Sequence, residues 1–114
     1  MQATLPDTLS PAVRAALADA REALYELYGA RLRQVVLFGS HARGEAHDES
    51  DVDVLVVLDG EVDYVTEARR VLDVQIDMLN RYELLLSLIP VALATYQDVG
   101  HPLMINVYDE GITL

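Results

Sequence analysis

The segment from residue 51 to residue 58, Asp-Val-Asp-Val-Leu-Val-Val-Leu, constrains the fold most strongly. Its apolar, β-branched residues predict a strand, and the Asp-Gly pair after it predicts a turn. Because side chains alternate across a strand, we expect Asp51 and Asp53 on one face with Leu55 and Val57, and the valines between them on the other. Two carboxylates then lie side by side at the start of an otherwise apolar strand.

The rest of the sequence predicts helices and strands in alternation. Ser10-Pro11 is typical of a helix start and Gly29 of its end, with apolar residues at three- and four-residue spacing between them. The next elements predicted are a strand over 34–38, a loop or short exposed helix over 40–50 and a helix over 63–80. A third strand is predicted over 84–88, closed by Ile89 and Pro90, and residues 91–96 would extend it after a bend. A short helix over 103–109 and an edge strand over 112–114 follow. This order predicts an α/β (α+β) fold, a mixed β-sheet with helices packed on it.

Length and composition narrow the class of protein. A chain of 114 residues has room for one hydrophobic core, so we expect a single domain over residues 1–114. It has no cysteine, which excludes disulfides and thiolate metal sites. The first ten residues lack a basic start followed by an apolar run, and no stretch approaches the ~18 apolar residues of a membrane span. We therefore expect a soluble, cytoplasmic protein.

The charge balance limits the partners. The formal net charge is −11, and all eight basic residues are arginines scattered along the chain. Such a chain offers no extended surface for nucleic-acid backbones, whereas its acidity suits divalent cations or a basic partner. The hydrophobic fraction of 52% leaves room for an exposed apolar patch, so an oligomer is compatible with the sequence.

Chemistry is expected where the two carboxylates start their strand. Two carboxylates side by side at the edge of a core are unfavourable unless a cation offsets their repulsion, and Mg²⁺ prefers oxygen ligands of this kind. The alternative is that Asp51 and Asp53 only cap a solvated strand end. Upstream, the strand over 34–38 runs into Gly39-Ser40, a turn that presents backbone N–H groups to an anion. The combination predicts a phosphate cradle beside a metal site.

The spacing of these two segments resembles a known family. Ten residues separate Ser40 of Gly39-Ser40-His41-Ala42-Arg43-Gly44 from Asp51 of Ser50-Asp51-Val52-Asp53. This pattern is similar to the signature of the polymerase-beta-like nucleotidyltransferases, in particular the minimal nucleotidyltransferase (MNT) domains. The signature covers residues 39–53, and the flanking helices and strands extend the resemblance over most of the chain.

The resemblance implies a nucleotidyltransferase core with assigned site residues. Gly39, Ser40 and Arg43 would bind the nucleotide, and Asp51 and Asp53 would be the catalytic residues and the Mg²⁺ ligands. ATP would be the substrate, with AMP transferred to a hydroxyl of a partner protein. The partner implied is a HEPN-type toxin, which makes the chain the antitoxin of a HEPN/MNT toxin–antitoxin pair. For Arg43 the equal alternative is an ion pair with a nearby carboxylate.

One position departs from the family pattern. Active members carry a third carboxylate on the next core strand, where this chain has Ser87, a neutral and poor base. Glu83 lies roughly 13 Å back along that strand, and Asp77 is on the preceding helix, so we assign neither as a substitute. Two other hypotheses stay open: a degenerate domain that neutralises its partner by binding alone, and an acidic interaction module whose aspartates bind only a cation.

The polar loop also contains two histidines. We interpret His41 and His47 as solvated loop side chains, because their spacing fits no common helical metal pair.

Overall fold

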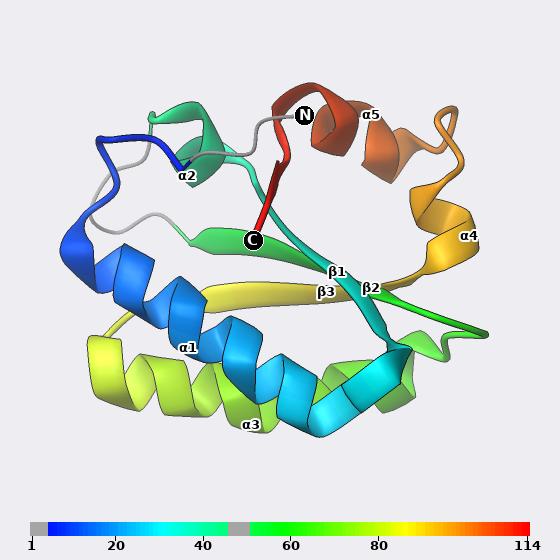
Figure 1. The fold of residues 1–114 in the computed structure, drawn as a ribbon, viewed down its shortest axis with the longest axis horizontal. Coiled ribbons are helices and arrows are strands. Elements are labelled where there is room, and N and C mark those ends of the chain that lie inside the picture. The colour runs from blue at the N-terminus through cyan, green and yellow to red at the C-terminus, as the bar shows by residue number, and fades with distance from the viewer. Residues whose placement is uncertain (1–4, 46–50) are drawn as a thin grey trace.

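The computed structural model describes residues 5–45 and 51–114. Its elements in chain order are α1 (Pro11–Tyr28), the 3-10 turn η1 (Gly29–Arg31), β1 (Leu32–Phe38), α2 (Ser40–Arg43), β2 (Val52–Leu58), α3 (Tyr64–Tyr82), β3 (Leu86–Ala92), α4 (Leu93–Tyr96), α5 (Pro102–Glu110) and β4 (Ile112–Thr113). In this part of the chain the strands form one sheet in the order β3-β2-β1-β4 (Figure 1). β1 is antiparallel to β2 and β4, and β2 is parallel to β3, which confirms the predicted mixed sheet.

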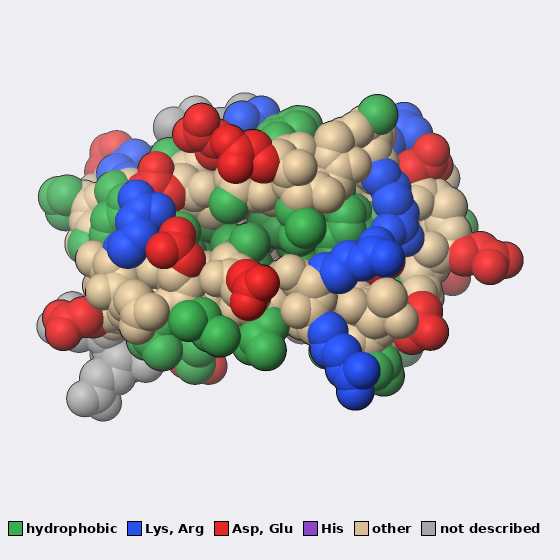
Figure 2. Space-filling view, turned by 90° about the horizontal axis from the view of Figure 1, so that it is seen from below, with side chains coloured by type: hydrophobic (Ala, Val, Ile, Leu, Met, Phe, Trp, Pro, Cys, Tyr) green, Lys and Arg blue, Asp and Glu red, His purple; other side chains and the backbone are tan. Residues whose placement is uncertain are grey.

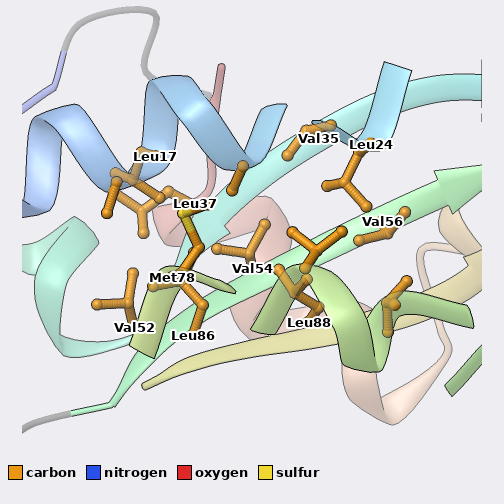
Figure 3. Close-up of a cluster of buried hydrophobic side chains, with 14 of the residues drawn as sticks. Leu17, Leu24, Val35, Leu37, Val52, Val54, Val56, Met78, Leu86 and Leu88 are labelled. Atoms are coloured by element: carbon orange, nitrogen blue, oxygen red, sulfur yellow. The ribbon is translucent and has the colours of Figure 1, made fainter. Parts of the chain in front are cut away.

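Helices cover both faces of the sheet, because β2 is apolar on both sides. Val54 and Val56 point into a core shared with α1 and α3, which Figure 3 shows in close-up. Leu55 and Val57 point the other way, into a second cluster formed with α4 and α5. Figure 1 shows these layers, with α1 and α3 on one side of the sheet and α4 and α5 on the other. The predicted alternation along this strand is confirmed.

The first helix begins and ends at the predicted residues. The Ser10 side chain accepts a hydrogen bond from the Val13 N–H at 3.2 Å, and Gly29 follows the last helical residue with a φ of 56°. Such a cap satisfies one of the N–H groups that a helix start leaves unpaired.

The predicted second long helix is also confirmed, but part of its apolar pattern faces outward. α3 turns Val71, Val74 and Met78 into the core. Four other apolar residues at helical spacing are instead exposed on its outer side: Val65, Leu72, Ile76 and Leu79. Figure 2 shows the face on the side of α1 and α3, where apolar side chains lie between scattered acidic and basic ones. Within residues 5–45 and 51–114, no helix combines the length and apolar composition needed to cross a membrane.

The third strand differs from its prediction. β3 begins at Leu86 rather than at residue 84, and it runs through Pro90, which was expected to close it. Pro90 is paired in register with Val56 of β2. It is tolerated because β3 is an edge strand, where a missing N–H removes no bond to a second neighbour. Residues 93–96 form α4 instead of extending the strand.

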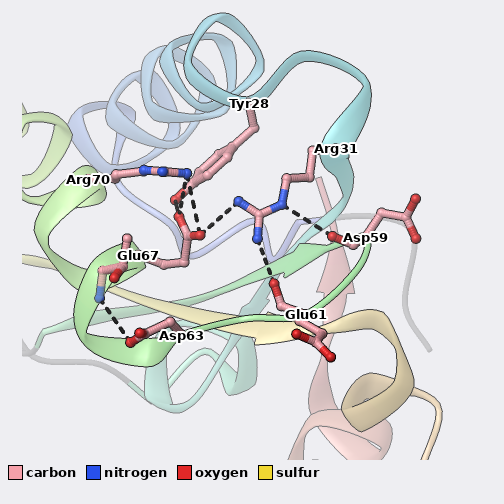
Figure 4. Close-up of polar contacts among 8 residues, drawn as sticks. Tyr28, Arg31, Asp59, Glu61, Asp63, Glu67 and Arg70 are labelled. Atoms are coloured by element: carbon pink, nitrogen blue, oxygen red, sulfur yellow. Dashed lines mark hydrogen bonds and ion pairs between the residues drawn. The ribbon is translucent and has the colours of Figure 1, made fainter.

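A buried carboxylate ties the start of α3 to the end of α1. Glu67 is 3% exposed and accepts hydrogen bonds from the Tyr28 hydroxyl at 3.0 Å and the Arg31 guanidinium at 2.7 Å (Figure 4). Arg70 lies 3.3 Å from the same carboxylate. Burial alone raises the pKa of Glu67, but the hydrogen bonds from Arg31 and Tyr28 outweigh it and hold the pKa below its ordinary value of 4.5. The ionised form of Glu67 therefore stabilises the fold.

We predict that Glu67→Gln lowers the free energy of unfolding by about 2 kcal/mol at neutral pH, because the amide cannot replace the charge-assisted bonds. A pKa lowered by folding gives stability that is present above the unfolded value and lost as the pH falls through the folded one. Urea titrations from neutral pH to about pH 3 should therefore show the wild-type advantage shrinking in acid. Asp77→Asn is the matched control, since it breaks only an exposed ion pair with Arg81 and should leave the unfolding free energy unchanged. A wild-type advantage that stays constant across this range would contradict the prediction.

Candidate functional site

Five elements meet at one end of the sheet. Phe38, the last residue of β1, is paired with Asp53 near the start of β2, and Asp53 is paired in turn with Ser87 near the start of β3. α2 follows β1 at this end, and the last residue of α5, Glu110, reaches it from the far side of β1. Paired residues point to the same side of a sheet, so Asp53 and Ser87 share a face.

Gly39 and the Asp53 carboxylate are in close contact. Gly39 has a φ of 78° and a ψ of −159°, a conformation that essentially only glycine adopts. A Cβ at this position would lie 3.2 Å from the Asp53 Cγ and closer still to a carboxylate oxygen. The absence of a side chain at Gly39 is therefore what leaves room for the carboxylate. The predicted juxtaposition of the glycine turn and the aspartate strand is present.

The two aspartates differ in environment. Asp51 is exposed just before β2, whereas Asp53 is half-buried within it. Burial raises the pKa of Asp53 above its ordinary value, and the negative charge of Asp51 raises it further. His41 and Arg43 act in the opposite direction. Repulsion between the carboxylates thus makes this site electrostatically favourable for a cation.

His41 is not the solvated loop residue that we expected. Its side chain is 6% exposed, because α2 packs it inward against the end of the sheet. His47, the other loop histidine, lies outside the described residues. His41 is close enough to Asp53 to lower the pKa of that carboxyl, so it belongs to the site. In the sequence, its position two residues after Gly39 was the signal that could have indicated this.

Arg43 is held by two carboxylates. Its Nε lies 3.0 Å from Glu45 and its Nη1 lies 2.7 Å from Glu110. Hydrogen bonds to Glu110 and Glu45 hold the pKa of Arg43 above its ordinary value. The ion-pair alternative considered for Arg43 is therefore the arrangement present. The guanidinium lies beside the Gly39 turn, since Glu110 also accepts a hydrogen bond from the Gly39 N–H at 3.0 Å.

Ser87 occupies the strand position next to Asp53. The register pairs the two residues directly, so Ser87 stands where the family resemblance leads us to expect a third carboxylate. Glu83 caps the end of α3 with a φ of 55°, and Asp77 pairs with Arg81 at the surface of that helix. α3 covers the opposite face of the sheet from Asp53. Among residues 5–45 and 51–114, no three His, Cys, Asp or Glu side chains are grouped closely enough to hold a metal by themselves.

Glu110 is the site residue that the sequence analysis missed. The predicted helix over 103–109 stopped one residue short of it. The structure places it by strand register: β4 pairs Ile112 with Leu37 and Thr113 with Val36, and continuing that register places Glu110 opposite Gly39. Pairing of β4 with β1, however, is not fixed by so short a strand in sequence alone.

Comparisons with known proteins agree with this architecture. The sequence model of the nucleotidyltransferase domain matches residues 17–113. Two proteins of Methanocaldococcus jannaschii, both named as candidate protein adenylyltransferases, are 47% identical over 45 residues and 37% identical over 57 residues. These segments cover 40% and 50% of this chain, and 45% and 57% of the relatives. The chain thus matches about half the length of these relatives.

Solved structures show the same fold at low sequence identity. A chain from a crystal structure of a toxin–antitoxin with AMP-PNP superposes with a TM-score of 0.59 at 18% identity, covering 83% of this chain and 69% of that one. A candidate nucleotidyltransferase from Sulfolobus solfataricus gives a TM-score of 0.51 at 20% identity, covering 92% and 86%. With the domain match over most of its length, the chain belongs to the nucleotidyltransferase domain family.

We predict that Gly39→Ala destabilises the protein by about 2 to 3 kcal/mol and displaces the Asp53 carboxylate, because the new Cβ needs the space that the carboxylate fills. Gly60→Ala is the matched control: Gly60 also has a positive φ, of 79°, but nothing lies within 4 Å of a Cβ there. Backbone strain alone should cost that variant about 1 kcal/mol. Urea titrations give the stabilities, and the carbon-13 shift of the Asp53 carboxyl reports its displacement. Equal losses with an unmoved Asp53 signal in both variants would contradict the contact.

Proposed function

We propose that this chain is a Mg²⁺-dependent nucleotidyltransferase that transfers AMP from ATP to a hydroxyl of a partner protein. The observation that carries the proposal is the Asp53 carboxylate in contact with the Gly39 turn, with Asp51 two residues before it. Membership of the nucleotidyltransferase domain family and the adenylyltransferase names of two relatives support the reaction class. AMP-PNP in the toxin–antitoxin structure supports an adenine nucleotide.

The chemistry is one phosphoryl-group displacement. The acceptor hydroxyl oxygen forms a bond to the α-phosphorus of ATP, the bond between the α-phosphorus and the bridging oxygen breaks, and pyrophosphate leaves. Gly39 leaves room for the Asp53 carboxylate beside the turn, and Ser40 and Arg43 would supply donors to the phosphates. With serine at position 87, the carboxylates left to accept the hydroxyl proton are Asp51 and Asp53.

The aspartates fit a bound magnesium ion. Mg²⁺ is usually held by one or two carboxylates together with water and substrate phosphates, so a site with fewer than three protein ligands is sufficient. Burial, and after it the charge of Asp51, raise the pKa of Asp53, and a bound dication would offset both by stabilising the ionised carboxylate. When bound, the ion would neutralise the charge that develops on the transferring phosphoryl group.

The proposed biological role is that of an antitoxin whose partner is a HEPN-type toxin. The toxin–antitoxin structure with the same fold supports a partner protein, and the HEPN type comes from the motif resemblance alone. The strongly acidic composition, with a net charge of −11, also suits association with a protein rather than with a nucleic-acid backbone.

We predict that the double variant Asp51→Asn, Asp53→Asn reduces AMP transfer to background, because it removes both proposed Mg²⁺ ligands. The assay incubates labelled ATP, Mg²⁺ and the partner toxin, and measures label on the partner. The folded pKa of Asp53 is raised, so the wild type loses stability as the pH rises through the unfolded value toward the folded one. The double variant should therefore be at least as stable as the wild type at neutral pH, and lost activity cannot be assigned to unfolding. Undiminished transfer by this variant would overturn the proposed function.

A second candidate function is neutralisation of the partner by binding alone. The observation that favours it is Ser87 at the strand position paired with Asp53. In this case the aspartate double variant would still protect cells from the partner, while an active transferase would lose that protection.

We predict that Ser87→Asp raises the AMP-transfer rate by about tenfold or more, because a carboxylate beside Asp53 supplies a further ligand and base. Ser87→Asn is the control of the same shape without the charge, and it should leave the rate at or below that of the wild type. The measurement is the initial rate of AMP transfer by each variant at saturating ATP and Mg²⁺. Equal rates for Ser87→Asp and Ser87→Asn would show that this position takes no part in the reaction.

A further inference from the structure

We propose that Glu110 is a positioning residue of the active site, whose carboxylate fixes the Gly39–Arg43 turn in the shape that accepts ATP. The inference rests on the proposed function and adds to it a residue from the other end of the chain. Glu110 would contact neither the nucleotide nor the metal. It acts through the two residues of the turn that its carboxylate holds.

The two oxygens of the Glu110 carboxylate have separate partners in the turn. Oε1 accepts the hydrogen bond from the Gly39 N–H at 3.0 Å, and Oε2 accepts one from the Arg43 guanidinium at 2.7 Å. The Glu110 side chain is 15% exposed and its bond to Gly39 is partly buried, whereas the Arg43 side chain is 43% exposed. Bonds of this kind to an ionised group are stronger than those between neutral groups. One carboxylate therefore spans the turn from its first residue to the end of α2.

The fold places Glu110 opposite Gly39. β1 and β4 are antiparallel, and the Leu114 N–H donates to the Val35 carbonyl at 2.9 Å, so the register holds along the described end of the chain. Gly111 allows the end of α5 to lie close to β1, because a Cβ at this position would lie 2.9 Å from a methyl group of Val36. The end of α5 is thus packed tightly on β1, and Glu110 has little freedom to move away from the turn.

The direction of the Gly39 N–H indicates that Glu110 positions the turn and does not compete with the phosphates of ATP for this donor. It points to the β4 side of β1, whereas Asp53 lies on the β2 side. A phosphate bound near the aspartates would therefore be approached by donors beyond Gly39, namely those of Ser40 and Arg43. Displacement of Glu110 is not required for ATP to bind, and its loss would release the turn that Asp53 packs against.

The test compares Glu110→Gln with Glu45→Gln. Both variants remove one negative charge and one ion pair to Arg43, but only Glu110 also accepts from Gly39. We expect Glu110→Gln to speed hydrogen exchange of the Gly39 amide about tenfold relative to that of Leu55, and to raise the KM for ATP about tenfold with little change in kcat. We expect Glu45→Gln to do neither. Amide exchange is followed by nitrogen-15 NMR, and the KM comes from the AMP-transfer assay with Mg²⁺.

Three results would overturn the positioning role: unchanged Gly39 exchange in Glu110→Gln, equal effects in Glu45→Gln, or a lower KM for ATP in Glu110→Gln, which would make Glu110 a competitor of the phosphates. A separate result tests the proposed function. If the wild-type protein neither transfers AMP nor binds ATP with Mg²⁺, the proposed function is wrong. The exchange comparison then decides by itself whether Glu110 holds the turn.

Discussion

Burial of β2 on both faces is the constraint on which the rest of the structure depends. A strand whose side chains are apolar on alternate sides must be covered twice, and the chain supplies α1 and α3 for one face and α4 and α5 for the other. The same strand carries Asp53 near its beginning, where the cover is incomplete. The position of the site at this end of the sheet is therefore a consequence of how the core is closed.

The site brings acidic side chains together, which is electrostatically unfavourable when no ligand is bound. Asp53 is half-buried, lies beside Asp51 and is near Glu110, and all of these raise its pKa. Part of the folding free energy is thus used to keep acidic groups together, as is common where a protein is built to bind a cation or a transition state. At the other end of β2 the opposite holds, because the buried Glu67 is matched by Arg31 and Tyr28 and stabilises the fold.

Much of this architecture could be predicted from the sequence, and the failures have physical causes. Hydrophobic spacing located α1 and α3, the capping residues Ser10 and Gly29 gave the ends of α1, and alternation along residues 51–58 gave the faces of β2. Pro90 was misread because a proline ends a strand only where its N–H would be needed, and whether β3 lies at an edge is a property of the whole sheet.

Within the site, local spacing brought Gly39 and Asp53 together in the prediction. His41 and Glu110 were misjudged for a different reason. The burial of His41 depends on how α2 packs against the end of the sheet, and the position of Glu110 depends on the pairing of β4 with β1. Packing between separate elements of this kind leaves no periodic pattern in the sequence.

The edge position of Pro90 has a consequence for self-association. An unpaired strand edge is a template for intermolecular β-pairing, and proteins restrict it with prolines or with very short strands. Here β3 interrupts its row of N–H donors at Pro90, and at the opposite border β4 consists of two residues. Growth of the sheet into a continuous aggregate across copies is therefore disfavoured on both borders.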